Sequence, residues 1–168
     1  MKKVSIFLSL LLITAVCLGC SAAGESQADK EPGFSGDAQV KVVTADGTAL
    51  TIDEKIMSAS EIAVFETTQG KSGEEPETNT HRGVLLKNVL SQAGVNIDSV
   101  NEIKCTSLDG FSKVYSKTDL NDPEKLFLTF QMDGEQLTYN NQDCFFIVAK
   151  NESFKQNWSK FLGEIVIS

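Results

Sequence analysis

Three Asp-Gly dipeptides constrain the fold of this chain more than any other feature. They are Asp46-Gly47, Asp109-Gly110 and Asp133-Gly134, and each lies between two short apolar stretches. An Asp-Gly pair favours a type I′ turn, because that turn requires positive φ at both central residues. The sequence therefore predicts three β-hairpins, whose strands cover residues 39–44 and 48–52, 102–108 and 111–116, and 126–132 and 135–139.

The remaining elements are expected to be further strands and a few short helices. Strands are expected at residues 62–67, 144–150 and 164–167, and short helical turns from Thr51, which has capping-box spacing to Glu54, and around residues 117–122. Many strands with few short helices indicate an α+β domain that is mostly β.

One amphipathic helix is clear. Leu86, Val89, Leu90 and Ala93 recur at the spacing that places side chains on one helical face. Gly94 follows and predicts the C-terminal end of this helix.

The N-terminus has the pattern of an export signal. Lys2 and Lys3 precede an apolar run over residues 4–18, which is shorter than the roughly 20 residues of a membrane-spanning helix. Gly19-Cys20 after this run resembles the lipobox of bacterial lipoproteins, although residues 17 and 18 depart from the usual pattern. The alternative is an ordinary cleaved signal with a chance cysteine.

The lipobox resemblance divides the chain into three parts. Residues 1–19 are the signal peptide, residues 20–36 a lipidated flexible tether and residues 37–168 one folded domain. The tether segment is small, polar and acidic, and lacks the apolar content needed to fold. We expect the protein to lie on the extracytoplasmic face of the cell membrane, anchored through lipid on Cys20.

The charge of the chain excludes one class of partner. Its formal net charge is −8, and removal of residues 1–19, which contain two lysines and no acidic residue, takes this to −10. A surface this acidic repels phosphate backbones, so we expect no nucleic-acid binding.

Cys105 and Cys144 leave two alternatives open. Outside the cytoplasm the pair could form a disulfide, but both residues lie in apolar, strand-like segments where buried unreactive thiols are equally plausible. The sequence has no Cys/His spacing typical of a zinc site.

Several segments in order carry a family resemblance. Residues 81–95 resemble a Gly-Val-Pro-Leu motif that leads into a helix ending in Ala-Gly, with Leu85 in place of the proline. Residues 106–111, 127–137 and 154–162 follow with a Ser-x-Asp-Gly-aromatic hairpin, an Asp-Gly-Glu hairpin and a Lys- and Trp-containing run. In this order they resemble the sulfite-oxidase-type molybdopterin-binding fold over residues 40–168, which implies mixed sheets and a few short helices.

The same resemblance shows a missing metal ligand. The family's enzymes ligate molybdenum through a cysteine thiolate that follows the strand expected at residues 62–67. When the family's glycine is matched to Gly70, Thr68 stands at that cysteine's position. A neutral hydroxyl is a poor substitute for a soft thiolate. No cofactor is therefore predicted, and molybdopterin remains an option only through the family resemblance.

Four residues are candidates for a binding site: Thr68, Arg82, Lys155 and Lys160. By the resemblance, the basic residues would hold an anionic group, whereas the commoner role of such residues is a solvated surface charge. Residues 69–82 are polar throughout and are expected to form a long loop beside this site.

Two further residues have alternative roles. His81, the sole histidine, could act as an axial ligand or general base, but we expect an exposed loop residue. Trp158, the sole tryptophan, could line a cleft, but such a residue more often lies in the core.

These observations favour a non-catalytic, lipid-anchored binding module that has kept the scaffold and lost the metal ligand. It would bind a small anionic ligand or an envelope protein near residues 68–82 and 154–161. The alternatives are a molybdopterin-dependent oxidoreductase acting outside the cytoplasm and an interaction domain without a pocket.

Overall fold

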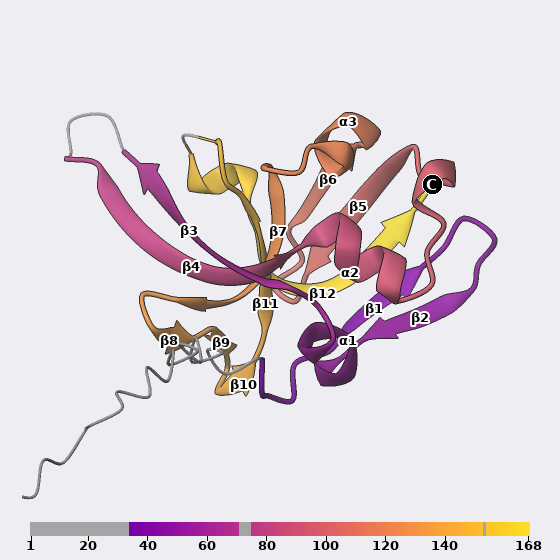
Figure 1. Cartoon of the computed structure of the whole chain (residues 1–168), viewed down its shortest axis with the longest axis horizontal. Coiled ribbons are helices and arrows are strands. Elements are labelled where there is room, and N and C mark those ends of the chain that lie inside the picture. Colours follow the sequence, from indigo (N-terminus) through magenta and orange to yellow (C-terminus); the bar gives the residue numbers. More distant parts are fainter. Residues whose placement is uncertain (1–33, 71–74, 153) are drawn as a thin grey trace, which may run out of the picture. The chain divides into compact units, whose positions relative to one another are not determined.

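A computed structural model of the protein describes residues 34–70, 75–152 and 154–168 (Figure 1). The predicted signal peptide, Cys20 and most of the predicted tether lie outside the described residues. No helix within the described residues is long and apolar enough to cross a membrane.

Strands dominate the described part of the chain. Ten of them form one sheet, in which β2-β1-β12-β11-β7-β4-β3 is the main path, β5 and β6 branch from β12, and β8 pairs with β7. The strands are β1 (Val40–Val43), β2 (Ala49–Ile52), β3 (Ile62–Gln69), β4 (Glu77–Leu85), β5 (Glu102–Ser107), β6 (Ser112–Ser116), β7 (Leu126–Met132), β8 (Glu135–Gln136), β11 (Phe145–Ala149) and β12 (Ser159–Ile167), and a separate small ladder pairs β9 (Thr138–Tyr139) with β10 (Gln142–Asp143).

The helices are short and few, as the sequence predicts. They are α1 (Glu54–Ser58), α2 (Leu86–Gln92), α3 (Lys117–Asn121) and the 3₁₀ turns η1 (Ile97–Ser99) and η2 (Lys155–Asn157). The β1–β12 pair is parallel, whereas the other strand pairs described are antiparallel. The protein is thus α+β, mostly β, with a mixed sheet, and the predicted fold class is confirmed.

All three Asp-Gly hairpins form, but only one has the predicted turn. Asp133 and Gly134 both have positive φ (53° and 83°) in a two-residue loop between β7 and β8. At Gly47 and Gly110 only the glycine has positive φ, and its N–H donates to the carbonyl three residues earlier, of Thr44 and Ser107 respectively. These two turns therefore begin earlier than predicted, and the left-handed glycine closes a longer loop.

Helices are present at all three predicted places, α1, α2 and α3, but the N-terminal cap predicted for α1 is wrong. Leu86, Val89 and Leu90 are buried on one face of α2, and Gly94 (φ 97°) follows its end. The α1 helix is capped by Asp53, whose side chain accepts a hydrogen bond from the Ile56 N–H. The predicted capping residue Thr51 is wrong, because it lies within β2.

The predicted long polar loop over residues 69–82 is also wrong. From residue 77 onward it is strand β4, which pairs with β3 from Ile62↔Val84 to Gln69↔Glu77. The inward positions of β4 include Asn79 and His81, so the strand lacks the apolar alternation that reveals a half-buried strand in a sequence.

The hydrophobic core extends further toward the N-terminus than residue 37. Phe34, within the segment predicted to be tether, is 2% exposed and packs against Phe130 and Phe145, with ring centroids 5.2 and 5.0 Å apart.

Cys105 and Cys144 are both free and buried, so the alternative of two buried thiols holds. Burial raises the pKa of both thiols, that of Cys144 to about 11.

Candidate functional site

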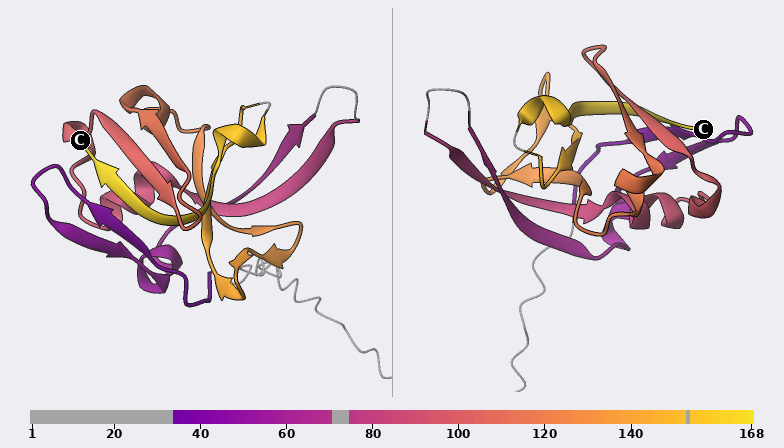
Figure 2. Two further views of the ribbon diagram at one scale, coloured as in Figure 1. Left: turned by 180° about the vertical axis from the view of Figure 1, so that it is seen from behind. Right: turned by 90° about the horizontal axis from the view of Figure 1, so that it is seen from above.

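The β3–β4 hairpin and the segment around η2 form the walls of a cleft. In all three views of Figures 1 and 2 this hairpin projects beside η2. Two adjoining hollows lie here, one of about 440 Å³ and one of about 300 Å³, and both are lined by Lys155, Gln156 and Lys160. The larger is further lined by Gln69, Gly70, Glu75, Glu77 and Phe154, and the smaller by Ser107, Asp109, Phe111 and Trp158.

The alternation of β3 decides which of its residues face the cleft. Thr67 and Gln69 are buried, and Gln69 lines the larger hollow. Thr68, between them, points to the opposite face, where its hydroxyl lies 3.0 Å from that of Thr78. The structure therefore does not bring Thr68 together with Lys155 and Lys160, although it stands at the position matched to the family's cysteine.

His81 lies in the interior beside this cleft and is not the exposed loop residue we expected. It is 1% exposed, and its Nε2 lies 2.9 Å from the Thr67 hydroxyl. Its ring stacks on Phe65 and meets Trp158 edge-on, with centroids 5.2 and 5.3 Å away. Burial lowers the pKa of His81 to about 4, so the ring is neutral at pH 7.

The floor of the smaller hollow contains buried polar groups without protein partners. Trp158 is 2% exposed and Ser107 is 5% exposed, and both line this hollow. Neither the indole N–H of Trp158 nor the hydroxyl of Ser107 has a hydrogen-bond partner among the described residues. The same is true of both amide atoms of Gln69, which lines the larger hollow. Because unsatisfied buried polar groups are rare, the floor is suited to a ligand or ordered water that supplies partners.

The three candidate basic residues have different surroundings. Lys155 forms an ion pair of 2.8 Å with Glu77 across the larger hollow. Lys160 is half-buried and forms no ion pair with another described residue. Arg82 lines neither hollow; it donates to the Gln131 Oε1 at 3.3 Å and lies over the ring of Phe130. The structure therefore brings together only Lys155 and Lys160 of the four predicted residues.

Lys160 lies within a bulge of β12. Phe161 has φ of 50°, an uncommon value for an aromatic residue, and the register of β12 with β11 shifts between Ser159 and Leu162. The register of β12 with β5 shifts between Leu162 and Glu164. Phe161 packs against Tyr139 and Phe146, with centroids 4.6 and 5.1 Å away. Bulges commonly redirect neighbouring side chains, and Lys160, beside this bulge, lines both hollows.

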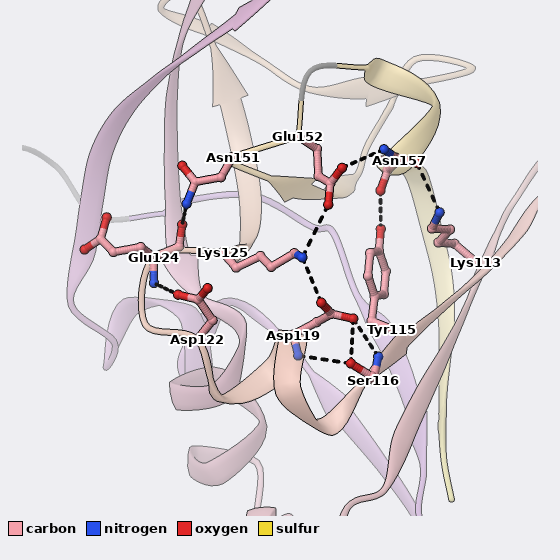
Figure 3. Close-up of polar contacts among 10 residues, drawn as sticks. All are labelled: Lys113, Tyr115, Ser116, Asp119, Asp122, Glu124, Lys125, Asn151, Glu152 and Asn157. Atoms are coloured by element: carbon pink, nitrogen blue, oxygen red, sulfur yellow. Dashed lines mark hydrogen bonds and ion pairs between the residues drawn. The ribbon is translucent and has the colours of Figure 1, made fainter.

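A polar network holds the segment that carries Lys155 (Figure 3). Lys125 Nζ bridges Asp119 at 2.8 Å and Glu152 at 3.3 Å. Glu152 accepts a hydrogen bond from the Asn157 side chain, whose backbone carbonyl accepts from the Tyr115 hydroxyl at 2.9 Å. We call these five residues the Lys125 clamp. Burial acts to raise the pKa of Asp119, but its hydrogen bonds with Lys125 and Ser116 outweigh this and leave that pKa lowered.

The residues of the cleft do not fit a molybdenum centre. Its described lining offers carboxylates, amides, a hydroxyl and ammonium groups, but no sulfur, whereas the metal ligand that the family resemblance implies is a soft thiolate. Neither Cys105 nor Cys144 lines the cleft. The described residues also contain no group of three His, Cys, Asp or Glu side chains placed to hold a metal ion.

Together, the mixed sheet, the short helices and the cleft beside the β3–β4 hairpin define a sulfite-oxidase-like fold. Among solved structures, the chain is similar to the crystal structure of the sulfane dehydrogenase SoxCD from Paracoccus pantotrophus, with a TM-score of 0.62 and 13% sequence identity. The match covers 80% of this chain and 39% of that chain, so it shows a shared fold over part of a longer protein. No protein-family model and no curated protein sequence matches the chain.

Proposed function

We propose that this protein is an extracytoplasmic, lipid-anchored binding module that holds a small anionic ligand in the cleft without catalysing a reaction. One observation carries the proposal. In a chain whose net charge is −8, two lysines line the same hollow as Ser107 and Trp158, whose buried polar groups have no partner among the described residues. Lys160, which forms no ion pair with another described residue, gives an anionic ligand a cation to bind in an otherwise acidic protein.

The non-catalytic part of the proposal is supported by the donor set. The strand position matched to the family's cysteine carries Thr68, whose side chain faces away from the cleft. Burial keeps His81, beside the cleft, neutral, and its Nε2 is in hydrogen-bond contact with the Thr67 hydroxyl. His81 is therefore poorly placed to exchange protons with a ligand. The competing function is a molybdopterin-dependent oxidoreductase, favoured only by the fold shared with SoxCD.

Elemental analysis separates these two functions. The full-length protein would be purified from the membranes of its host, grown with ample molybdate, and its molybdenum measured by mass spectrometry. The binding-module function predicts far less than one molybdenum atom per chain. A stoichiometric molybdenum content would overturn it and establish the oxidoreductase.

The anchor is tested separately with Cys20. We expect the wild-type protein to sediment with membranes and its mature N-terminal peptide to carry added acyl mass. The Cys20→Ser variant is expected in the soluble extracytoplasmic fraction. If wild type and variant fractionate alike and no acyl mass is found, the lipid anchor is wrong.

A further inference from the structure

The charges around the cleft restrict the kind of anion that it can hold. The larger hollow is lined by two acidic residues, Glu75 and Glu77, and two basic ones, so its described charges cancel. The smaller hollow is lined by Lys155, Lys160 and one acid, Asp109. Since Lys155 is already paired with Glu77 at 2.8 Å, Lys160 is the cation left to receive a ligand's charge. A polyanion would face several carboxylates with one available cation.

Apolar surface stands beside that single cation. Phe111 and Phe154, which line the smaller and larger hollow respectively, are 47% and 54% exposed. Trp158 forms part of the floor. A ligand with an apolar body could cover both phenylalanine rings, and burial of apolar surface is favourable roughly in proportion to its area. An inorganic oxyanion would leave these rings in water.

The floor supplies neutral hydrogen-bond donors next to Lys160. The hydroxyl of Ser107 and the indole N–H of Trp158 lack partners among the described residues, and both side chains are more than nine-tenths buried. Neutral donors with one ammonium group complement a singly charged carboxylate, because its oxygens accept several hydrogen bonds without needing a second cation.

From these three observations we infer that the ligand of the cleft is a small organic monoanion with an aromatic or similarly flat apolar body. Its carboxylate-like group lies at Lys160 above Ser107 and Trp158, and its body lies against Phe111 and Phe154. The inference rests on the proposed binding function and narrows it, because it excludes phosphorylated and other multiply charged ligands.

Calorimetric titration of the full-length protein in detergent tests this inference with three probes: benzoate, acetate and inorganic pyrophosphate. Benzoate is expected to bind about tenfold more tightly than acetate, since its ring is the added apolar contact, and more tightly than pyrophosphate. Lys160→Gln and Phe111→Ser should each weaken benzoate binding about tenfold.

Matched controls lie on the neighbouring β5–β6 surface. Lys104→Gln removes an exposed lysine and Val114→Ser an exposed apolar side chain (50% exposed), and neither residue lines the cleft. Both controls should leave benzoate binding unchanged.

The possible failures are distinguishable. Pyrophosphate binding that exceeds benzoate binding and is lost in Lys160→Gln would overturn the aromatic monoanion but keep the binding module. Benzoate binding that is absent, or that is unaffected by both cleft variants, would also overturn the inference. If none of the probes binds and the protein retains no molecule from its host, the proposed function fails as well.

Discussion

At the scale of single residues, the interior side of the β3–β4 hairpin is unusually polar. Thr67, Gln69, Asn79 and His81 all have exposures of 5% or less. Two of them are half satisfied. Asn79 Nδ2 donates to the Asp133 carboxylate at 3.0 Å and His81 Nε2 lies 2.9 Å from the Thr67 hydroxyl, whereas Asn79 Oδ1 and His81 Nδ1 have no hydrogen-bond partner among the described residues. Neither amide atom of Gln69, which lines the larger hollow, has a partner among these residues. A domain retains such groups in its interior at the expense of stability, which is typical of a site that serves binding.

The pKa of His81 predicts an acid-dependent loss of stability. Its native pKa of about 4 is below the ordinary value of 6.5, so the unfolded chain binds a proton first as the pH falls. Stability linked to His81 is therefore complete above pH 6.5 and is lost progressively between pH 6.5 and 4, by up to about 1.4 kcal/mol per pH unit. Urea denaturation at pH 7 and pH 4.5 should show a smaller acid-induced loss for His81→Gln than for wild type. Equal losses in the two proteins would contradict this assignment.

At the scale of elements, the two cleft lysines lie in segments with special local structure, the Lys125 clamp and the β12 bulge. The clamp joins the end of β6 and helix α3 to the segment that carries Lys155, and the bulge contains Lys160. Neither device could be predicted from the sequence. The clamp joins residues far apart in the chain, and the positive φ falls on Phe161, a residue type that gives no signal for it.

The clamp makes a prediction about local stability. Lys125→Met removes ion pairs with Asp119 and Glu152 that are partly shielded from water, each worth about 0.5 kcal/mol. Hydrogen exchange of amides in residues 154–158 should become about fivefold faster, because this segment loses its attachment to α3. Lys41→Met, which breaks the exposed 2.9 Å pair with Glu164, should leave that exchange unchanged. Unaltered exchange in Lys125→Met would show that the clamp does not hold the segment.

The elements also show what a sequence pattern can reveal. Helix α2 was predictable because Leu86, Val89 and Leu90 share a face that packs on an apolar core. Strand β4 was not, because its inward positions Asn79 and His81 are polar and its outward positions are polar too. The side chains of the cleft were therefore only partly predictable. Lys155 and Lys160 were candidates through the family resemblance, whereas Gln69 and Ser107 became candidates only through their burial.

At the scale of the whole molecule, the folded unit includes residues that composition assigned to the tether. Phe34 follows a polar, acidic stretch, and its isolated ring carried no periodic signal. In the structure its ring packs against Phe130 from β7 and Phe145 from β11, so Phe34 is part of the hydrophobic core.

Replacement of Phe34 tests this boundary. Phe34→Ala should lower the free energy of unfolding by about 3 kcal/mol, the usual effect of truncating a buried phenylalanine. Phe154→Ala is a matched control, since that ring is 54% exposed, and should change stability by less than about 0.5 kcal/mol. Chemical denaturation of both variants measures the difference. Equal stabilities would mean that Phe34 belongs to the tether.

The central claim for the whole molecule is that this fold holds a small organic ligand instead of a molybdenum cofactor. Native mass spectrometry of the full-length protein, purified from its host's membranes, tests it most directly. We predict a wild-type species that carries one small organic molecule without molybdenum, and a Lys160→Gln species that has lost it. A retained adduct that contains molybdenum and a pterin, or a wild-type protein that retains nothing, would contradict the claim.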